Sequence, residues 1–597
     1  MHRLFKTIIF FLFYVLFSLN PLLSQIPLNQ NTLPAINLRT DFSKQNTTWN
    51  WLGHFKIEKQ INQNEFLSLK ETFQSNLITP SNSIKQWKDE HRFKGLYYSG
   101  LNQFLWGVYI NSWLLFDKQQ ATRNEFSNHS GALFIKYEPI KKISFLPYAG
   151  VQRAKNITKS DIGLDIGIDG SANNFEFGAY KNNLDISSNY DFFETRKNYN
   201  NRFSNKISTK FNKFTTDSLK VSYEEVSKQF YNTSGTSLIE VKLYNRSIQN
   251  NLIYALSNQN QFTFETNILS KNVSFNTNNN VSSTNRNVFL IENRVQFRHL
   301  GQLSYQLDFR TNDETLDNRE TITDSRTRQS SLALKSKYFI SDKSNLKFDF
   351  IYNKLQYDTP NEKNTDDRDE QRFIFDIGYT TQLSPVLTFR LNAYGFLFHQ
   401  IYLFKEQSIN NNWNRVLKIS PQVKYKNDIF ENSLSTSVIA NYTVFDFENL
   451  GPKIRSFLSR KYTISDSVLV PVYKKMAIGL NARLEIEEKG NFLKKKFAQN
   501  LIQSYRVTKY NIYATQKLFR RLGYRVGYLF FSRLEWRHVP KKSKNRTITN
   551  QGPFGSIYYN VNNRISLNAY AAINFVDDSR NIKSRYSTGF LKLFYSL

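Results

Sequence analysis

Apolar and polar residues alternate with a period of two along much of the chain. Residues 161–169 alternate aspartate or glycine with isoleucine or leucine without a single break. In residues 522–537 the even positions are mostly aromatic or aliphatic, and the odd positions carry mostly glycine, arginine and glutamate, with Leu529 and Phe531 as exceptions. Successive side chains of a β-strand point to opposite faces, so these stretches predict strands with one apolar and one polar face. The same pattern occurs at residues 346–353, 476–486 and 564–575.

The stretches between the predicted strands are alternately short and long. Short connections are expected near residues 341–345, 383–386, 426–429, 489–491, 520–523 and 561–563. Longer polar connections are expected near residues 311–327, 357–372, 400–413, 448–471, 538–552 and 577–585. One tight rim and one loose rim are typical of outer-membrane β-barrels, with turns on the periplasmic side and loops outside. A soluble β-sandwich has no reason to follow this rule.

Composition favours a membrane barrel over a soluble sheet protein. Aromatic residues make up 15% of the chain, with 51 Phe and 34 Tyr, yet the mean hydropathy is −0.52. Beyond the N-terminus, no apolar run approaches the roughly 18 residues that a membrane-spanning helix needs. No helical stripe with caps and no fixed-length repeat is found. An aromatic-rich chain that is hydrophilic on average fits strands with lipid on one face and water on the other.

The length of the chain sets the expected number of strands and the domain boundaries. A polar segment, residues 26–46, is expected to be an extended periplasmic segment, and residues 47–597 a single transmembrane barrel. At about 20 residues per strand, the fold class is all-β: one large antiparallel barrel of about 26 strands, with roughly 22 to 28 as the range. Alternation is weak at residues 185–250, which leaves open a plug subdomain or a long external excursion there.

The N-terminus has the parts of a secretory signal peptide. Arg3 and Lys6 precede an apolar run at residues 8–19, which Ser18 alone interrupts, and Pro21 and Ser24 follow. The run is about twelve residues, too short for a spanning helix, which needs roughly 20. Residues 1–25 are therefore expected to be a cleaved signal for export; an uncleaved anchor helix is the alternative.

The C-terminal residues resemble a known targeting signal. Counted back in twos from the end, one face of the last predicted strand carries Leu597, Tyr595, Leu593, Leu591 and Gly589. This resembles the closing strand of bacterial outer-membrane β-barrel proteins, although that family usually ends in Phe or Trp. The resemblance implies location in the outer membrane of a Gram-negative cell, lipid and lipopolysaccharide as surroundings, and the barrel-assembly machinery as a partner. It identifies no subfamily. In size the chain is also similar to the barrel of the lipopolysaccharide-export translocon, but that protein's soluble domain and disulfide cysteines are lacking.

Charge narrows the expected partners. The formal net charge is +31, which on a soluble protein would suggest nucleic acid. The basic residues form no arm or helix, and export separates the chain from nucleic acid, so no nucleic-acid partner is expected. A basic lumen or rim would instead favour anionic solutes, anionic polymers or lipid headgroups.

Candidate chemistry is sparse. Cysteine is absent, which excludes thiol catalysis and cysteine-ligated metals. The seven histidines stand singly, at positions 2, 54, 91, 129, 299, 399 and 538, and none lies two or four residues from another as local metal ligands do. A barrel lipase would need Ser or Asp beside a histidine in space, with His299 and His399 as candidates. No catalytic, cofactor-binding or metal-ligating residue is assigned, and no cofactor and no enzymatic activity are expected.

Two acidic stretches of the sequence are candidates for an ion-binding site. Asp161, Asp165 and Asp169 share one strand face, but residues four apart on a strand are separated by about 13 Å, too far to bind one ion together. These aspartates are expected to line the lumen and to pair with basic neighbours. The acidic segment 358–370, with Arg368 inside it, is expected to be a solvated external loop.

The sequence thus predicts a porin-like transport or channel protein with a basic, anion-favouring lumen. Two alternatives stay open: a structural or adhesive outer-membrane protein that presents long loops, and a barrel enzyme that modifies lipids.

Overall fold

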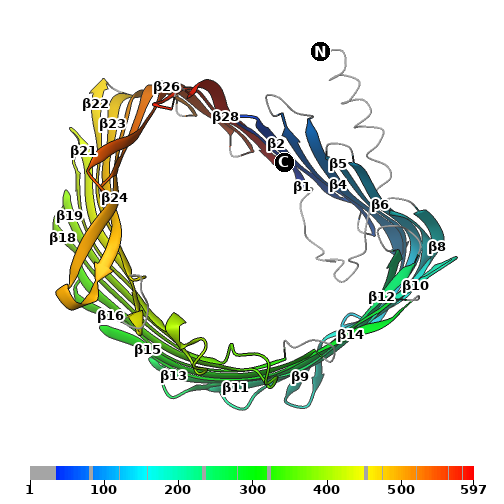
Figure 1. Cartoon of the computed structure of the whole chain (residues 1–597). Coiled ribbons are helices and arrows are strands. Elements are labelled where there is room, and N and C mark those ends of the chain that lie inside the picture. Colours follow the sequence, from blue (N-terminus) through cyan, green and yellow to red (C-terminus); the bar gives the residue numbers. More distant parts are fainter. Residues whose placement is uncertain are drawn as a thin grey trace.

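A computed structural model describes residues 35–596, apart from 63, 80–84, 102, 120–121, 157–158, 232–236, 278–279, 319–323, 449–454, 474, 520, 563 and 581. The described chain forms one 28-stranded antiparallel sheet closed into a ring (Figure 1). The predicted fold class is confirmed, with two strands more than the central expectation. The predicted signal peptide, residues 1–25, and residues 26–34 lie outside the described residues.

The strands follow one another around the ring in chain order. The first half comprises β1 (Ala35–Gln45), β2 (Thr48–Asn62), β3 (Glu65–Ile78), β4 (Gln86–Leu101), β5 (Phe104–Gln119), β6 (Thr122–Ile140), β7 (Ile143–Asn156), β8 (Lys159–Phe177), β9 (Tyr180–Phe193), β10 (Lys197–Lys210), β11 (Thr215–Tyr231), β12 (Leu238–Ala255), β13 (Asn260–Thr277) and β14 (Asn280–His299). The second half comprises β15 (Leu303–Asn318), β16 (Ser325–Ser341), β17 (Ser344–Asp358), β18 (Arg368–Ser384), β19 (Leu387–Tyr402), β20 (Asn412–Lys426), β21 (Glu431–Phe445), β22 (Phe457–Tyr473), β23 (Met476–Leu493), β24 (Ala498–Phe519), β25 (Leu522–Arg537), β26 (Ser543–Asn562), β27 (Ile565–Asp578) and β28 (Ile582–Ser596). Single 3₁₀ turns lie at Ser408–Asn410 and Lys494–Lys496.

The ring closes where β1 pairs with β28. Asn37 lies opposite Ser596 and Gln45 opposite Thr588, while the other edge of β1 pairs with β2. The barrel therefore begins at Ala35, inside the segment that was expected to be periplasmic, and that boundary is corrected. The reason is that a closed sheet needs a partner for the free edge of β28, and residues 35–45 supply it.

Residues 185–250 belong to the wall. They form parts of β9 and β12 and all of β10 and β11, each paired along its length with its neighbours. Alternation is weak there because the outward face of β10 interleaves asparagines with its apolar residues, as at Asn201 and Asn205. The described residues of this segment, 185–231 and 237–250, therefore form neither a plug nor an external excursion.

The connections at the two rims of the barrel differ in length, as predicted. The rim with the longer connections contains more strand and less loop than the sequence predicted. On one rim every connection spans two to four residues; on the other the connections span two to eleven. Most of the predicted long loops are strand: β15 runs on to Asn318, β22 begins at Phe457 and β26 at Ser543. Strands that rise beyond an apolar band are wetted on both faces, so they lose the alternation that marks them in sequence.

One predicted turn is wrong. Residues 489–491 lie inside β23, and the pairing of β23 with β24 shifts register between Lys489 and Gly490. The Lys-Gly-Asn sequence predicts a turn, but in the structure it forms a β-bulge, a common role of glycine within a strand. The other five predicted short connections coincide with tight turns.

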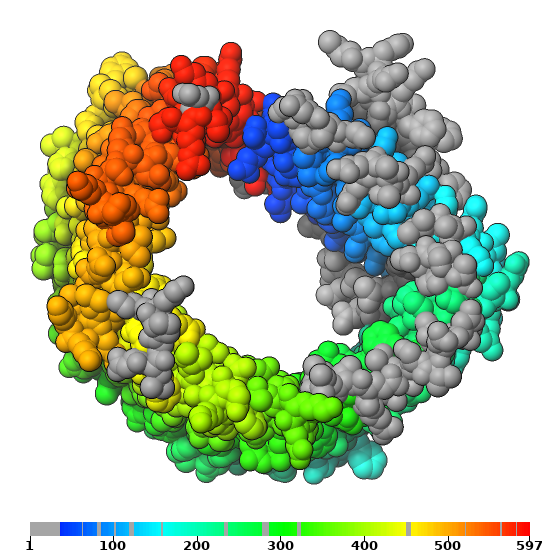
Figure 2. All heavy atoms as spheres, in the orientation of Figure 1, coloured from blue at the N-terminus to red at the C-terminus, as the bar shows by residue number. Residues whose placement is uncertain are grey.

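The outer face of the barrel is apolar. On β8 the outward Ile162 and Leu164 are more than half exposed, whereas Asp161 and Asp165, which flank them in sequence, are buried on the inner face. On β25, Val526 is 56% exposed on the outer face. An apolar surface that continues around a ring is stable against lipid rather than water. The inner face carries the aspartates of β8 and the arginines of β25, and the ring surrounds an open central space (Figure 2).

Candidate functional site: the lumen wall

Chemically distinctive side chains gather on two sectors of the inner wall. One, here called the basic sector, lies on β16–β20; the other, the packed sector, lies on β3–β9. In Figure 1 β8 and β19 stand on opposite sides of the ring. Antiparallel partners face the same side of a sheet, so the pairing register shows which residues share the inner face.

The basic sector consists of six lysine and arginine side chains. Arg390 on β19 pairs in register with Gln422 on β20, and Lys418 pairs with Tyr394, which places both cations on the inner face. The members are Lys335, Lys337, Arg390, Lys418, Lys424 and Lys426, and all six are exposed. Nearby acids neutralise part of this charge, since Glu431 contacts Lys424 and Lys426, each at 3.3 Å. Exposed cations on a concave wall attract anions from the lumen.

The packed sector is buried and carries acidic groups. The ring of Tyr109 on β5 reaches across two strands, and its hydroxyl donates a 2.8 Å hydrogen bond to Oδ2 of Asp165 on β8. Tyr109 is 4% exposed and Asp165 1%. Contact between strands three apart is possible because side chains converge on the concave face of a barrel.

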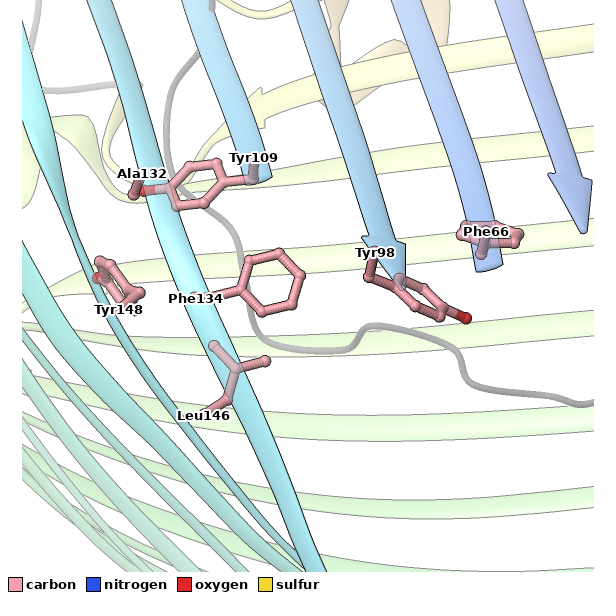
Figure 3. Packing of buried hydrophobic residues seen from close by; sticks show 7 residues of the cluster. All are labelled: Phe66, Tyr98, Tyr109, Ala132, Phe134, Leu146 and Tyr148. Atoms are coloured by element: carbon pink, nitrogen blue, oxygen red, sulfur yellow. The ribbon is translucent and has the colours of Figure 1, made fainter. Parts of the chain in front are cut away.

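Apolar side chains surround Tyr109. The buried cluster comprises Phe66, Tyr98, Tyr109, Ala132, Phe134, Leu146 and Tyr148 (Figure 3). In Figure 3 the ring of Tyr109 extends from its own strand toward Ala132. The rings of Tyr109 and Tyr148 meet edge to face, with centroids 5.9 Å apart. This cluster excludes water from the wall beside Asp165, which strengthens the electrostatic interactions there.

Glycines opposite aromatic residues allow this dense packing. Gly107 pairs with Phe134 and Gly167 with Tyr148, and each aromatic ring lies where a side chain on the glycine would be. Tyr513 covers Gly479 and Phe554 covers Gly527 in the same way on β23–β26. Aromatic rings over strand glycines fill the gap left by the missing side chain and fix the register.

The three aspartates singled out in sequence have different surroundings. Asp161 accepts a 2.7 Å ion-pair hydrogen bond from Arg196, and both side chains are buried, so its predicted basic neighbour is found. Asp165 instead accepts from Tyr109, and no ion pair to it is seen among the described residues. Asp169 lies on the same inner face, paired in register with Ser187.

Sequence reasoning missed the partner of Asp165. In the pairing of β8 with β9, Asp165 stands directly opposite Asp191. The two residues are far apart in sequence, and nothing in the sequence fixes the register of these two strands. The alternation of β9 would have placed Asp191 on the polar face, but not opposite another aspartate.

The histidine candidates for lipid chemistry lie on the outer face. His399 is hydrogen bonded to Asp446 at 2.8 Å and stacks on Trp413, and His299 contacts Asn260 at 2.7 Å. Two serine–histidine contacts that were not expected occur elsewhere, Ser112 with His129 and Ser504 with His538, each at 2.7 Å. A hydrolase triad also needs an acid that orients the histidine, and a serine–histidine contact by itself carries no catalytic assignment.

The acidic segment 358–370 closes on itself. The backbone N–H of Thr359 donates to Asp367 at 2.7 Å, and its hydroxyl contacts the same carboxylate. Arg368 pairs with Glu370 at 2.9 Å at the start of β18. Within the described ranges, no three His, Asp or Glu side chains are grouped closely enough to hold a metal ion. No helix in that part of the chain is long and apolar enough to cross a membrane.

Comparisons with known proteins give only distant structural likenesses. No protein-family model matches the chain, and no curated protein sequence matches it. Among solved structures, pyoverdine-bound FpvA of Pseudomonas aeruginosa aligns with 94% of this chain and 72% of its own at 8% identity, with a TM-score of 0.37. The copper transporter OprC aligns with 95% and 81% at 8% identity and TM-score 0.37. BauA, the ferric preacinetobactin receptor of Acinetobacter baumannii, aligns with 95% and 80% at 9% identity and TM-score 0.36. At these scores the likeness carries no function over to this chain.

Proposed function

We propose that the protein is a transport barrel of a bacterial outer membrane, whose lumen favours anionic solutes. The observation that carries the proposal is the basic sector: Lys335, Lys337, Arg390 and Lys418 are exposed on the inner wall of a closed barrel. Charge arranged along a concave wall raises the local concentration of the opposite charge. The apolar outer face and the tight-turned rim support the location in that membrane.

The width of the barrel supports transport rather than a purely structural role. Strands that stand about 4.8 Å apart and tilt by roughly 40° give 28 strands a backbone ring about 55 Å across. Barrels of this size leave a lumen far wider than side chains can fill. The alternative adhesive role draws less support, because most of the expected long loops are strands of the wall.

Ion selectivity tests the proposal directly. The purified full chain is inserted into planar bilayers, and the reversal potential is measured across a KCl gradient. We expect large conductance steps and a preference for chloride. Replacing both Arg390 and Lys418 with Glu should lower the chloride-to-potassium permeability ratio roughly twofold or more, because four units of charge change on one wall.

Two controls make this experiment decisive. Lys418→Arg keeps the charge and should keep the selectivity. Raising the salt from about 0.1 M to about 1 M shortens the screening length from about 10 Å to roughly 3 Å and should abolish the preference. Absence of conductance, or selectivity that the double variant leaves unchanged, overturns the proposed function.

A further inference from the structure

The pairing of β8 with β9 places two carboxylates face to face. Asp165 and Asp191 are direct cross-strand partners on the inner wall, and side chains in that relation have Cβ atoms about 5 Å apart. Like charges directly opposite one another destabilise a sheet. A cation between them would remove that repulsion.

Two basic groups lie near Asp191, Arg196 and Lys228, and neither forms an ion pair with it. Arg196 donates to Asp161 and to the backbone carbonyl of Gln229, and its guanidinium lies over the ring of Phe193. Asp191 accepts only a long hydrogen bond, 3.4 Å, from the amide of Asn198. No lysine or arginine of the described chain forms an ion pair with Asp165 or Asp191.

A second observation points to a ligand. Asp165 is 1% exposed, and its Oδ1 has no hydrogen-bond partner, although Tyr109 satisfies Oδ2. Two residues along β5 from Tyr109, both polar atoms of the Asn111 amide are also buried and without partners. Buried polar atoms are rarely left unsatisfied, and each such atom costs about 1–3 kcal/mol.

We propose that Asp165 and Asp191 bind a divalent cation that keeps part of its water shell, with Mg²⁺ as the first candidate. Mg²⁺ is commonly held by one or two carboxylates and several waters, which agrees with the absence of a third acidic or histidine ligand among the described residues. The site is separate from the basic sector and does not depend on the transport proposal.

The test is calorimetric titration of the folded full chain in detergent with MgCl₂ and, separately, CaCl₂ at low ionic strength. We expect one saturable site. Asp165→Asn and Asp191→Asn should each raise the dissociation constant roughly tenfold or more, because each removes a charged ligand, and loss of even an indirect partner costs 10- to 100-fold. The matched control is Asp376→Asn, which removes a lumen carboxylate that already pairs with Lys347 at 2.8 Å.

Folding is monitored by heat-modifiable migration in gels. If Asp165→Asn fails to fold, the binding measurement on Asp191→Asn tests the proposal. Asp191 is only half-buried, so its substitution should disturb folding less. Absence of saturable binding to the wild type overturns the proposal. Binding that both variants retain also overturns it. Neither result affects the selectivity of the basic sector, so the two proposals fail separately.

Discussion

The packed sector and the basic sector are made from the same kind of strand but bury their inner faces to different degrees. On β5–β9, aromatic rings lie over glycines and cover Asp165 until it is 1% exposed. On β16–β20 the inner lysines and arginines remain exposed. The inner wall of a wide barrel is therefore not uniform. One stretch is packed like the core of a soluble protein, and the other is a wet surface.

The difference in burial determines how a charged side chain interacts in the packed sector and in the basic sector. A charge in the packed sector interacts strongly with a fixed partner because water is excluded. A charge in the basic sector is screened and acts on mobile ions. Substitutions in the packed sector should therefore change stability, whereas those in the basic sector should change selectivity and leave stability nearly as it is.

The largest contrast is expected between two ion pairs. Arg196→Met leaves Asp161 buried without its cation and should lower the free energy of unfolding by about 3 kcal/mol. Lys347→Met removes an exposed pair with Asp349 and Asp376 and should cost about 0.5 kcal/mol. Urea unfolding in lipid vesicles measures both. Equal losses in the two variants would contradict the distinction between the sectors.

Glycine substitutions probe the packing itself. Gly107→Ala places a methyl group against the ring of Phe134 and should destabilise the barrel by about 2 kcal/mol. The control is Gly395→Ala on the outer face of β19, where the new methyl group would lie 3.6 Å from Phe375 and should be tolerated. The temperature at which the heat-modifiable band is lost reports the difference. An unchanged temperature for Gly107→Ala would show that the packed sector rearranges to accept the extra methyl group, and it would contradict the prediction.

The smallest effect concerns a single hydroxyl. Tyr109→Phe keeps the ring in the cluster but removes the hydrogen bond to Asp165, at an expected cost of about 1.5 kcal/mol. Tyr513→Phe is the control, because that ring packs over Gly479 in the same way and should lose little. Thermal midpoints of the two variants compare them. Indistinguishable midpoints would mean that the Tyr109 hydroxyl contributes nothing to the wall.

Strand existence was predictable from sequence because the two faces of each strand meet different media. The unbroken alternation at residues 161–169 lies within β8, and the two exceptions at Leu529 and Phe531 lie on the inner face of β25. Leu529 packs against the cluster of Tyr513, Phe554 and Ala572. These two apolar residues therefore break the alternation because they lie on a packed part of the inner wall. The sequence shows the break but not its cause.

Register and strand length were not predictable. The pairing of Asp165 with Asp191 depends on which residues of β8 and β9 are opposite one another, and alternation is the same for every shift of two residues. Strand ends above the apolar band, such as Asn318 on β15, are polar on both faces and resemble loops in composition. The start of β1 at Ala35 was missed because a polar edge segment carries little apolar signal.

The pairing of β1 with β28 also constrains how the barrel is made. Asn37 and Ser596 are partners, so the pairing that closes the wall joins residues from opposite ends of the described chain, and it costs more loop-closure entropy than the pairing of any two consecutive strands. Until then the growing sheet has two open edges, each with a row of unsatisfied N–H and C=O groups inside or beside a membrane. Such edges pair readily with other chains. The seam is therefore the step at which this protein is most exposed to error, and the place where a helper that holds one edge would have the greatest effect on yield.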